Sequence, residues 1–299
     1  MQPGPFAPPD RTGTTTAGNA AVPGGIYLCQ VNRRVSCGAC CGVYNVADAA
    51  YAPLLALLTE RTADFAGVPR QADAIADFGR LALVRSGAGP YPDFHHCPFV
   101  GLIGAEGRRV GCLLHPLSAG NQGVDYRGLS FYGGMACRVY FCAAHSGLSP
   151  VIKSIVRKSA ANWYEYGLVI TETTLLNEFF TILENRLGSA LREADILGSR
   201  QCRQMMARVL QLKIDWPFRG YPDPGPCHYL FEDRLYAKPA VGYPAMVASP
   251  SAYDSLLKEL RSVFKTPADL ELAEKTLTDL IDALAEAIRR GRHDRASHA

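Results

Sequence analysis

Residues 36–42 read Ser36-Cys37-Gly38-Ala39-Cys40-Cys41-Gly42, a Cys-x-x-Cys-Cys motif flanked by small residues. Seven of the ten cysteines of the chain lie between positions 37 and 142, namely Cys37, Cys40, Cys41, Cys97, Cys112, Cys137 and Cys142. Thiolates are soft ligands, and proteins build zinc and iron–sulfur sites from them at such short spacings. The motif therefore predicts a module whose fold is organised by bound metal.

The overall composition is that of an ordinary globular protein. The 299 residues are 48% hydrophobic and 20% charged, enough for one large domain or two small ones. A formal net charge of +3 is close to balanced, which argues weakly against a dedicated nucleic-acid-binding protein. No apolar run is long enough for a membrane span, and the N-terminus lacks the features of a secretory signal. We therefore expect a cytoplasmic protein, whose cysteines bind metal rather than form disulfides.

The segment of residues 26–148 combines two predicted helices with a loop-rich stretch. Apolar residues recur at helical spacing over 48–65 and 71–84. Further along, glycines separate aromatic and β-branched residues, which predicts a short β-hairpin with strands at 98–103 and 109–114. Such a stretch buries little apolar surface by itself and depends on cross-links. This segment is the expected cysteine-cluster module.

The rest of the chain is expected to be mostly helical. Ser149-Pro150 begins a helix, because Ser is a preferred N-cap and Pro suits the first helical position. Thr266-Pro267-Ala268-Asp269 resembles a capping box at the start of a final helix, which Gly291 is expected to end.

These signals divide the chain into a disordered N-terminal arm at 1–25, the cysteine-cluster module at 26–148, a helical region at 149–290 and a flexible tail at 291–299. The expected fold class is α+β. A small, irregular, metal-stapled module with a short β-hairpin packs against a mostly α-helical C-terminal half.

The register of the hairpin decides which side chain lies beside Cys97. A turn centred between positions 104 and 105 places Cys97 opposite Cys112. A turn centred on Glu106 places it opposite His115 instead, and then Cys112 and His115 form a Cys-x-x-His pair of ligands. Both registers are open at this stage.

The candidate metal ligands are Cys37, Cys40, Cys41, Cys97, Cys112, Cys137, Cys142 and His115. They would satisfy two tetrahedral zinc ions, one held by four cysteines and the other by three cysteines and the histidine. Alternatively, four thiolates hold one zinc ion or one [4Fe–4S] cluster and leave three for a second or open site. Because neighbouring side chains in extended backbone point in opposite directions, Cys41 either faces a different ion or partner from Cys40 or is an inert buried thiol.

Several residues near this pattern have other expected roles. His95 and His96 directly precede Cys97 and could supply an extra ligand or a proton-transfer group, or form an ordinary loop pair. Arg138 is expected to bind the loop backbone or to offset the negative charge of the thiolates. Three cysteines stand outside the pattern and are expected to be ordinary thiols: Cys29, Cys202 and Cys227.

Four pieces of sequence occur in a characteristic order: Cys37-Gly38-Ala39-Cys40-Cys41, Cys97-Pro98-Phe99-Val100, Gly111-Cys112-Leu113-Leu114 and Cys137-Arg138-Val139-Tyr140-Phe141-Cys142. In this combination, roughly residues 29–145 resemble the YkgJ-type cysteine-cluster family, whose members are described as zinc- or iron-chelating proteins. The resemblance implies a chelated metal and assigns no reaction. The flagellin lysine methylase is similar in its cysteine cluster, which keeps an enzymatic function in view.

The expected function is therefore metal chelation, with zinc or with iron, the latter including a [4Fe–4S] cluster. Two alternatives belong to other classes. One is an enzyme, either a transferase like the lysine methylase or an iron–sulfur redox protein. The other is an adaptor with a structural zinc site that binds a protein partner through its amphipathic C-terminal helices.

Overall fold

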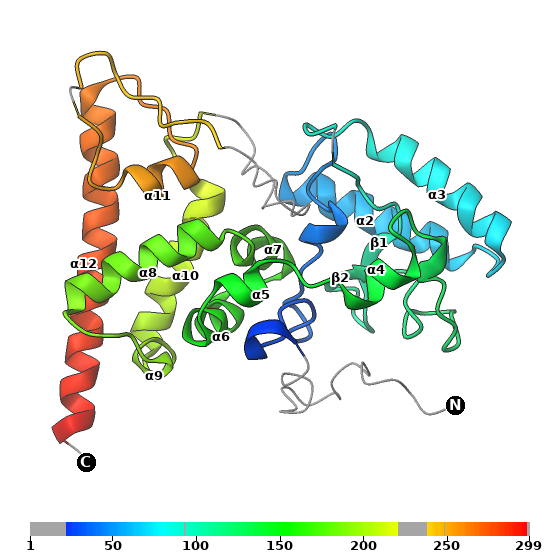
Figure 1. Ribbon diagram of the computed structural model, residues 1–299, viewed down its shortest axis with the longest axis horizontal. Helices are drawn as coiled ribbons and strands as arrows, with labels where there is room; N and C mark the ends of the chain where they lie inside the picture. Colours follow the sequence, from blue (N-terminus) through cyan, green and yellow to red (C-terminus); the bar gives the residue numbers. More distant parts are fainter. Residues whose placement is uncertain (1–21, 93, 221–237, 248, 298–299) are drawn as a thin grey trace.

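The computed structural model describes residues 22–92, 94–220, 238–247 and 249–297 (Figure 1). Most of these residues are helical, and the described part of the chain contains a two-stranded antiparallel sheet, which makes the fold α+β. No helix in the described ranges is long and apolar enough to cross a membrane. Residues 1–21 of the expected arm, and Cys227, lie outside the described residues.

The cysteine-cluster side of the molecule, on the right of Figure 1, holds the hairpin and two long helices. Its elements in chain order are η1 (Pro23–Gly25), η2 (Ala39–Cys41), α2 (Tyr51–Ala66), α3 (Ala72–Ser86), β1 (Val100–Ile103), β2 (Arg109–Cys112), η3 (Arg127–Leu129) and α4 (Gly133–Val139). The two predicted helices and the predicted hairpin are confirmed. Phe65 of α2, Phe78 of α3 and Phe99 pack together, with 5.0 Å between the ring centroids of the first two.

The second half of the chain is mostly helical in its described part. Its elements are α5 (Ala144–Gly147), α6 (Pro150–Ser159), α7 (Trp163–Ile170), α8 (Thr173–Leu187), α9 (Glu193–Leu197), α10 (Arg200–Asp215), α11 (Asp254–Glu259) and α12 (Pro267–Ser297). Ser149 caps α6 by accepting a 3.2 Å hydrogen bond from the backbone N–H of Ile152. Thr266 and Asp269 exchange side-chain-to-backbone hydrogen bonds at the start of α12, as the capping-box pattern predicts.

The prediction that Gly291 ends the last helix is wrong, because α12 continues to Ser297. Arg292 and Arg295, on the turn beyond Gly291, reach the carboxylate of Asp195 in α9 at 2.6 and 2.8 Å. That carboxylate is fully buried. A glycine inside a helix costs about 1 kcal/mol relative to alanine, and these two ion pairs stabilise the helix beyond it.

Helix α7 lies between the two halves. All of its residues are buried, and they are divided between the apolar cores of the two sides. Trp163 and Leu168 belong to the apolar core of the cysteine-cluster side, whereas Tyr166 and Ile170 belong to the core of the helical side. Cys37 packs against both cores. The Cys-x-x-Cys-Cys motif therefore lies at the junction of the two halves.

Candidate metal centre

The hairpin adopts the register centred on Glu106. Val100 pairs with Cys112, and the ladder ends there, so Cys97 lies beyond its last rung. The backbone N–H of Cys97 instead donates a 2.9 Å hydrogen bond to the carbonyl of Cys41. Continuing the ladder would have placed Cys97 opposite His115, but this hydrogen bond draws the chain toward the Cys-x-x-Cys-Cys motif.

Four thiols gather around the hairpin, and we call Cys41, Cys97, Cys112 and Cys137 the hairpin group. Burial, and then Cys97, raise the pKa of Cys112 to about 12, and Cys137 acts in the same direction. Burial raises the pKa of Cys97 to about 11, again with a contribution from Cys137. A hydrogen bond to Cys40, followed by burial, raises the pKa of Cys41, and Cys97 and Cys112 raise it further. Cys97, Cys112 and Cys137 thus oppose the ionisation of other thiols in the group, and Cys40 opposes that of Cys97 as well.

A second set of four thiols lies where the two halves meet, and we call Cys29, Cys37, Cys40 and Cys142 the junction group. Burial raises the pKa of Cys29, and Cys40 and Cys142 raise it further. Burial and then Cys40 raise the pKa of Cys142 to about 12. Burial and then Cys37 raise the pKa of the Tyr166 hydroxyl, which Cys29 and Cys142 also raise. Tyr166 therefore lies within electrostatic reach of three members of this group.

The two groups adjoin at Cys40 and Cys41. The thiol of Cys41 donates a hydrogen bond to the sulfur of Cys40, which lowers the pKa of Cys40 against the opposing effect of burial. The two adjacent residues thus fall into different groups while their sulfurs remain neighbours. The motif closes at Gly42, whose φ of 72° and close approach to the carbonyl of His95 leave no room for a side chain.

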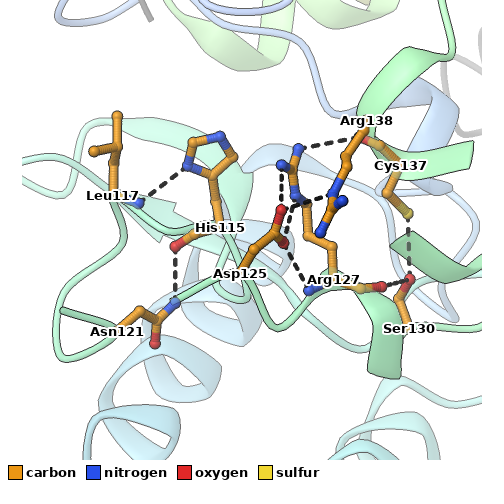
Figure 2. Close-up of polar contacts among 8 residues, drawn as sticks. All are labelled: His115, Leu117, Asn121, Asp125, Arg127, Ser130, Cys137 and Arg138. Carbon is orange, nitrogen blue, oxygen red and sulfur yellow. Dashed lines mark hydrogen bonds and ion pairs between the residues drawn. The ribbon is translucent and has the colours of Figure 1, made fainter. Parts of the chain in front are cut away.

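A charged network borders the hairpin group (Figure 2). The Asp125 carboxylate lies between the guanidinium groups of Arg127 and Arg138, at 2.7 and 2.8 Å. Hydrogen bonds from Arg127 hold the pKa of Asp125 well below its usual range. Arg127 also donates to the carbonyl of Cys137 at 3.3 Å. The Ser130 hydroxyl lies 3.2 Å from the Cys137 sulfur (Figure 2). The network thus places positive charge beside thiols of the hairpin group.

The eighth ligand expected from the sequence, His115, has its contacts elsewhere. Its Nδ1 accepts a 3.2 Å hydrogen bond from the backbone N–H of Leu117 (Figure 2). Burial lowers its pKa, followed by Arg127, while Asp125 raises it. No thiol of the described residues is among the groups that act on His115. Among the described residues, His115 thus shows no hydrogen bond from its ring to a thiol, and its role as a ligand stays a prediction.

His96 is also occupied by protein partners. Its Nδ1 lies 2.8 Å from the carbonyl oxygen of Gly42, and its Nε2 lies 2.9 Å from a guanidinium nitrogen of Arg61. A carbonyl only accepts and a guanidinium only donates, so the ring is neutral with its proton on Nδ1. Burial lowers the pKa of His96 to about 3. Neither nitrogen is free to bind a metal, and His96 instead anchors the segment that carries Cys97.

Cys29, which the sequence predicts to be an ordinary thiol, lies beside the Cys-x-x-Cys-Cys motif. Its carbonyl accepts a 2.8 Å hydrogen bond from the N–H of Cys37, across a bridge between Gln30 and Ser36. The loop between them turns at Asn32, whose side-chain oxygen accepts hydrogen bonds from the backbone N–H groups of Arg34 at 2.8 Å and Val35 at 2.9 Å. An Asn that forms such a turn is a recognisable sequence signal. It would have linked Cys29 to the motif despite their separation along the chain.

The chemistry of the donors fits a soft metal. All nine cysteines in the described residues are free thiols, and eight of them form the two groups. Within those residues, no three Cys, His, Asp or Glu side chains already converge on a single ligating position. Their mutual repulsion as thiolates is what a bound cation would remove, because a coordinated thiol loses its proton outright. Binding would then draw the sulfurs of each group together.

Comparison with known proteins adds no relative to this picture. No protein-family model, curated protein or solved structure matches the chain significantly. The case for a function therefore stands on the arrangement of the thiols.

Proposed function

We propose that this protein chelates metal through eight thiolates, four from the hairpin group and four from the junction group. The observation that carries the proposal is that eight free thiols, drawn from distant parts of the chain, gather around the hairpin and the junction, where most of them oppose the ionisation of a neighbouring thiol. Four thiolates are the complete ligand set of a structural zinc ion or of one [4Fe–4S] cluster.

The surroundings of the thiols support the same function. Arg127 raises the local positive charge beside the hairpin group, which favours the thiolate forms that a metal requires. Free thiols in this number suit a reducing compartment, so we place the protein in the cytoplasm. The bound metals would staple the irregular module to the helical half through the junction group.

The test is elemental analysis of the full chain purified without oxygen and without chelators. About two zinc ions per chain in a colourless protein would support a zinc version of the proposal. Iron and acid-labile sulfide, with a brown colour and absorbance near about 400 nm, would support the cluster version. Titrating metal-free chain with Zn²⁺ in weak buffer should also release protons, because burial keeps most of these thiols protonated.

The proposal fails if the chain carries no metal as purified and the metal-free chain releases no protons when Zn²⁺ is added. A thiol reagent gives an independent check. In the presence of Zn²⁺, ligating thiols should react slowly, so equal reactivity with and without the metal would also contradict chelation. Circular dichroism shows whether the metal-free chain has unfolded. The metal content is measured on the protein as purified, so unfolding of the metal-free chain does not affect that result.

A further inference from the structure

His145 lies in α5, three residues after Cys142, and is almost completely buried. Both of its ring nitrogens have partners. The backbone N–H of Leu28 lies 3.3 Å from Nε2, and the sulfur of Cys142 lies 3.6 Å from Nδ1. The imidazole thus spans the residue that precedes Cys29 and a member of the junction group.

The partner at Nε2 fixes the position of the proton. A backbone N–H can only donate, so Nε2 must accept and carries no hydrogen. The ring is then the neutral tautomer with its hydrogen on Nδ1. That N–H group faces Cys142, whose sulfur lies 3.6 Å away and whose backbone carbonyl is a second acceptor.

We propose that His145 is a positioning residue of the junction group. Its Nδ1–H donates to the sulfur of Cys142, and its Nε2 holds the backbone that carries Cys29. The inference rests on the proposed metal-chelating function, and it names a residue outside the predicted ligands. A hydrogen bond to a ligating sulfur stabilises the thiolate over the thiol and orients it, and such supporting contacts affect metal affinity strongly.

The neighbours of His145 keep the ring in place. The rings of Phe141 and Tyr27 pack near it, with centroids 5.0 and 6.4 Å away. The ammonium group of Lys153 donates to the carbonyl of His145 and, at 2.9 Å, to the carbonyl of Gly24. The backbone of α5 is therefore tied to the N-terminal segment independently of the imidazole. A substitution of the His145 side chain therefore leaves the backbone contacts made by Lys153 in place, so its effect reports on the imidazole.

Two amide substitutions separate the two nitrogens. In His145→Asn the amide nitrogen can take the place of Nδ1 and donate to Cys142, while the acceptor for Leu28 is lost. In His145→Gln the amide oxygen can take the place of Nε2 and accept from Leu28, while the donor to sulfur is lost. His145→Ala removes both. Asn177→Ala is the matched control. Asn177, in α8, donates at 3.1 Å to the carbonyl of Gly147, which lies in α5 like His145, and this contact involves no thiol.

The measurement is competition for Co²⁺ and Zn²⁺ between the full chain and a coloured chelator, which resolves the affinities of the two equivalents. We expect His145→Gln and His145→Ala to weaken one equivalent by about 10- to 100-fold and to leave the other unchanged. His145→Asn should keep an affinity closer to wild type, and Asn177→Ala should match wild type. Circular dichroism of each variant shows whether it is folded.

Two results would overturn the inference. One is a folded His145→Gln variant that binds both equivalents as tightly as wild type. The other is nitrogen NMR of the wild-type imidazole that places the proton on Nε2. If the wild-type chain binds no metal at all, the proposed function fails, and the NMR measurement still decides whether the N–H···S hydrogen bond exists.

Discussion

A guanidinium nitrogen of Arg61 lies 2.9 Å from Nε2 of His96 in the interior of the cysteine-cluster side. The same guanidinium donates to the carbonyl of Val100 at 2.9 Å and to the hydroxyl of Ser86 at 2.7 Å. Burial lowers the pKa of Arg61 to about 10, so it remains a cation at neutral pH. One buried charge thus ties α2 to α3, to β1 and to the residue before Cys97.

Replacing Arg61 by Leu should lower the free energy of unfolding by about 3 kcal/mol, because three buried polar groups lose their partner. Urea denaturation of both proteins measures the difference. Arg85→Ala is the control, since Arg85 forms an exposed ion pair with Glu60 and should cost less than about 1 kcal/mol. Equal losses in the two variants would contradict the role given to Arg61.

The contact between Gly167 and Tyr44 tests the junction of the two halves. A Cβ atom at Gly167 would lie 2.2 Å from the Tyr44 hydroxyl, which is buried and donates at 3.0 Å to the carbonyl of Tyr164. Gly167→Ala should therefore lower the free energy of unfolding by about 1–3 kcal/mol. Adding Tyr44→Phe should recover part of this loss, because it removes the clashing oxygen.

Gly128→Ala serves as the control for this pair of variants. A Cβ at Gly128 meets nothing within 4 Å, so its stability should stay close to wild type. Thermal or urea unfolding of wild type, the two single variants, the double variant and Gly128→Ala gives the comparison. Strictly additive effects of Gly167→Ala and Tyr44→Phe would show that the two residues do not clash.

Asp195 should make the helical half sensitive to acid. Burial by itself would raise its pKa, but hydrogen bonds from Arg292 and Arg192 lower the pKa to about 2. A carboxyl with a depressed pKa stabilises the fold above its unfolded pKa, and this stabilisation is lost as the pH falls through the folded value. The window here runs from about pH 4 down to about pH 2.

At pH 7, Asp195→Asn should lower the free energy of unfolding by about 1–2 kcal/mol relative to wild type. The difference should shrink below about pH 4, where wild type begins to lose the same stabilisation. Urea unfolding at several pH values measures it. Asp282→Asn, which removes an exposed ion pair with Arg186, should change stability by less than about 1 kcal/mol. A difference for Asp195→Asn that stays constant down to pH 3 would argue against the ion-pair explanation.

Cys29 and Cys202 distinguish a ligand from an ordinary thiol. Cys29 belongs to the junction group, whereas Cys202 is buried in the helical core. Cys29→Ser should remove about half of the bound metal, since one four-thiolate group would be incomplete. Cys202→Ser should keep the metal and lower the free energy of unfolding by about 1–2 kcal/mol, because it buries a hydroxyl. Full metal content in Cys29→Ser would exclude Cys29 from the ligands.

Local signals predicted much of the fold. The Ser149 cap and the capping box of Thr266 and Asp269 act within a few residues, so the sequence near them is sufficient. The hairpin followed from its glycines and β-branched residues. Gly291 was misread because the contacts that extend α12 come from Asp195, far away in sequence.

The candidate site likewise combines features that local sequence predicts with features that depend on distant contacts. The seven cysteines were found by spacing, which is a local property. The register of the hairpin was one of two alternatives, and a backbone hydrogen bond between Cys97 and Cys41 decides what lies beside Cys97. Cys29 joins the junction group through a turn at Asn32. His145 lies only three residues after Cys142, but its contact with Leu28 spans 117 residues, which no local pattern reports.

The link between Leu28 and His145 joins positions that are 117 residues apart. Cys29 follows Leu28 and Cys142 lies three residues before His145, so a metal bound by both cysteines would cross-link the chain into a loop of nearly that length. For a disulfide, a loop of about 100 residues restricts the unfolded chain enough to contribute about 4–5 kcal/mol. Loading of the junction group would therefore act on the entropy of the unfolded chain. Loss of the metal would make the whole segment between these cysteines more open to proteases.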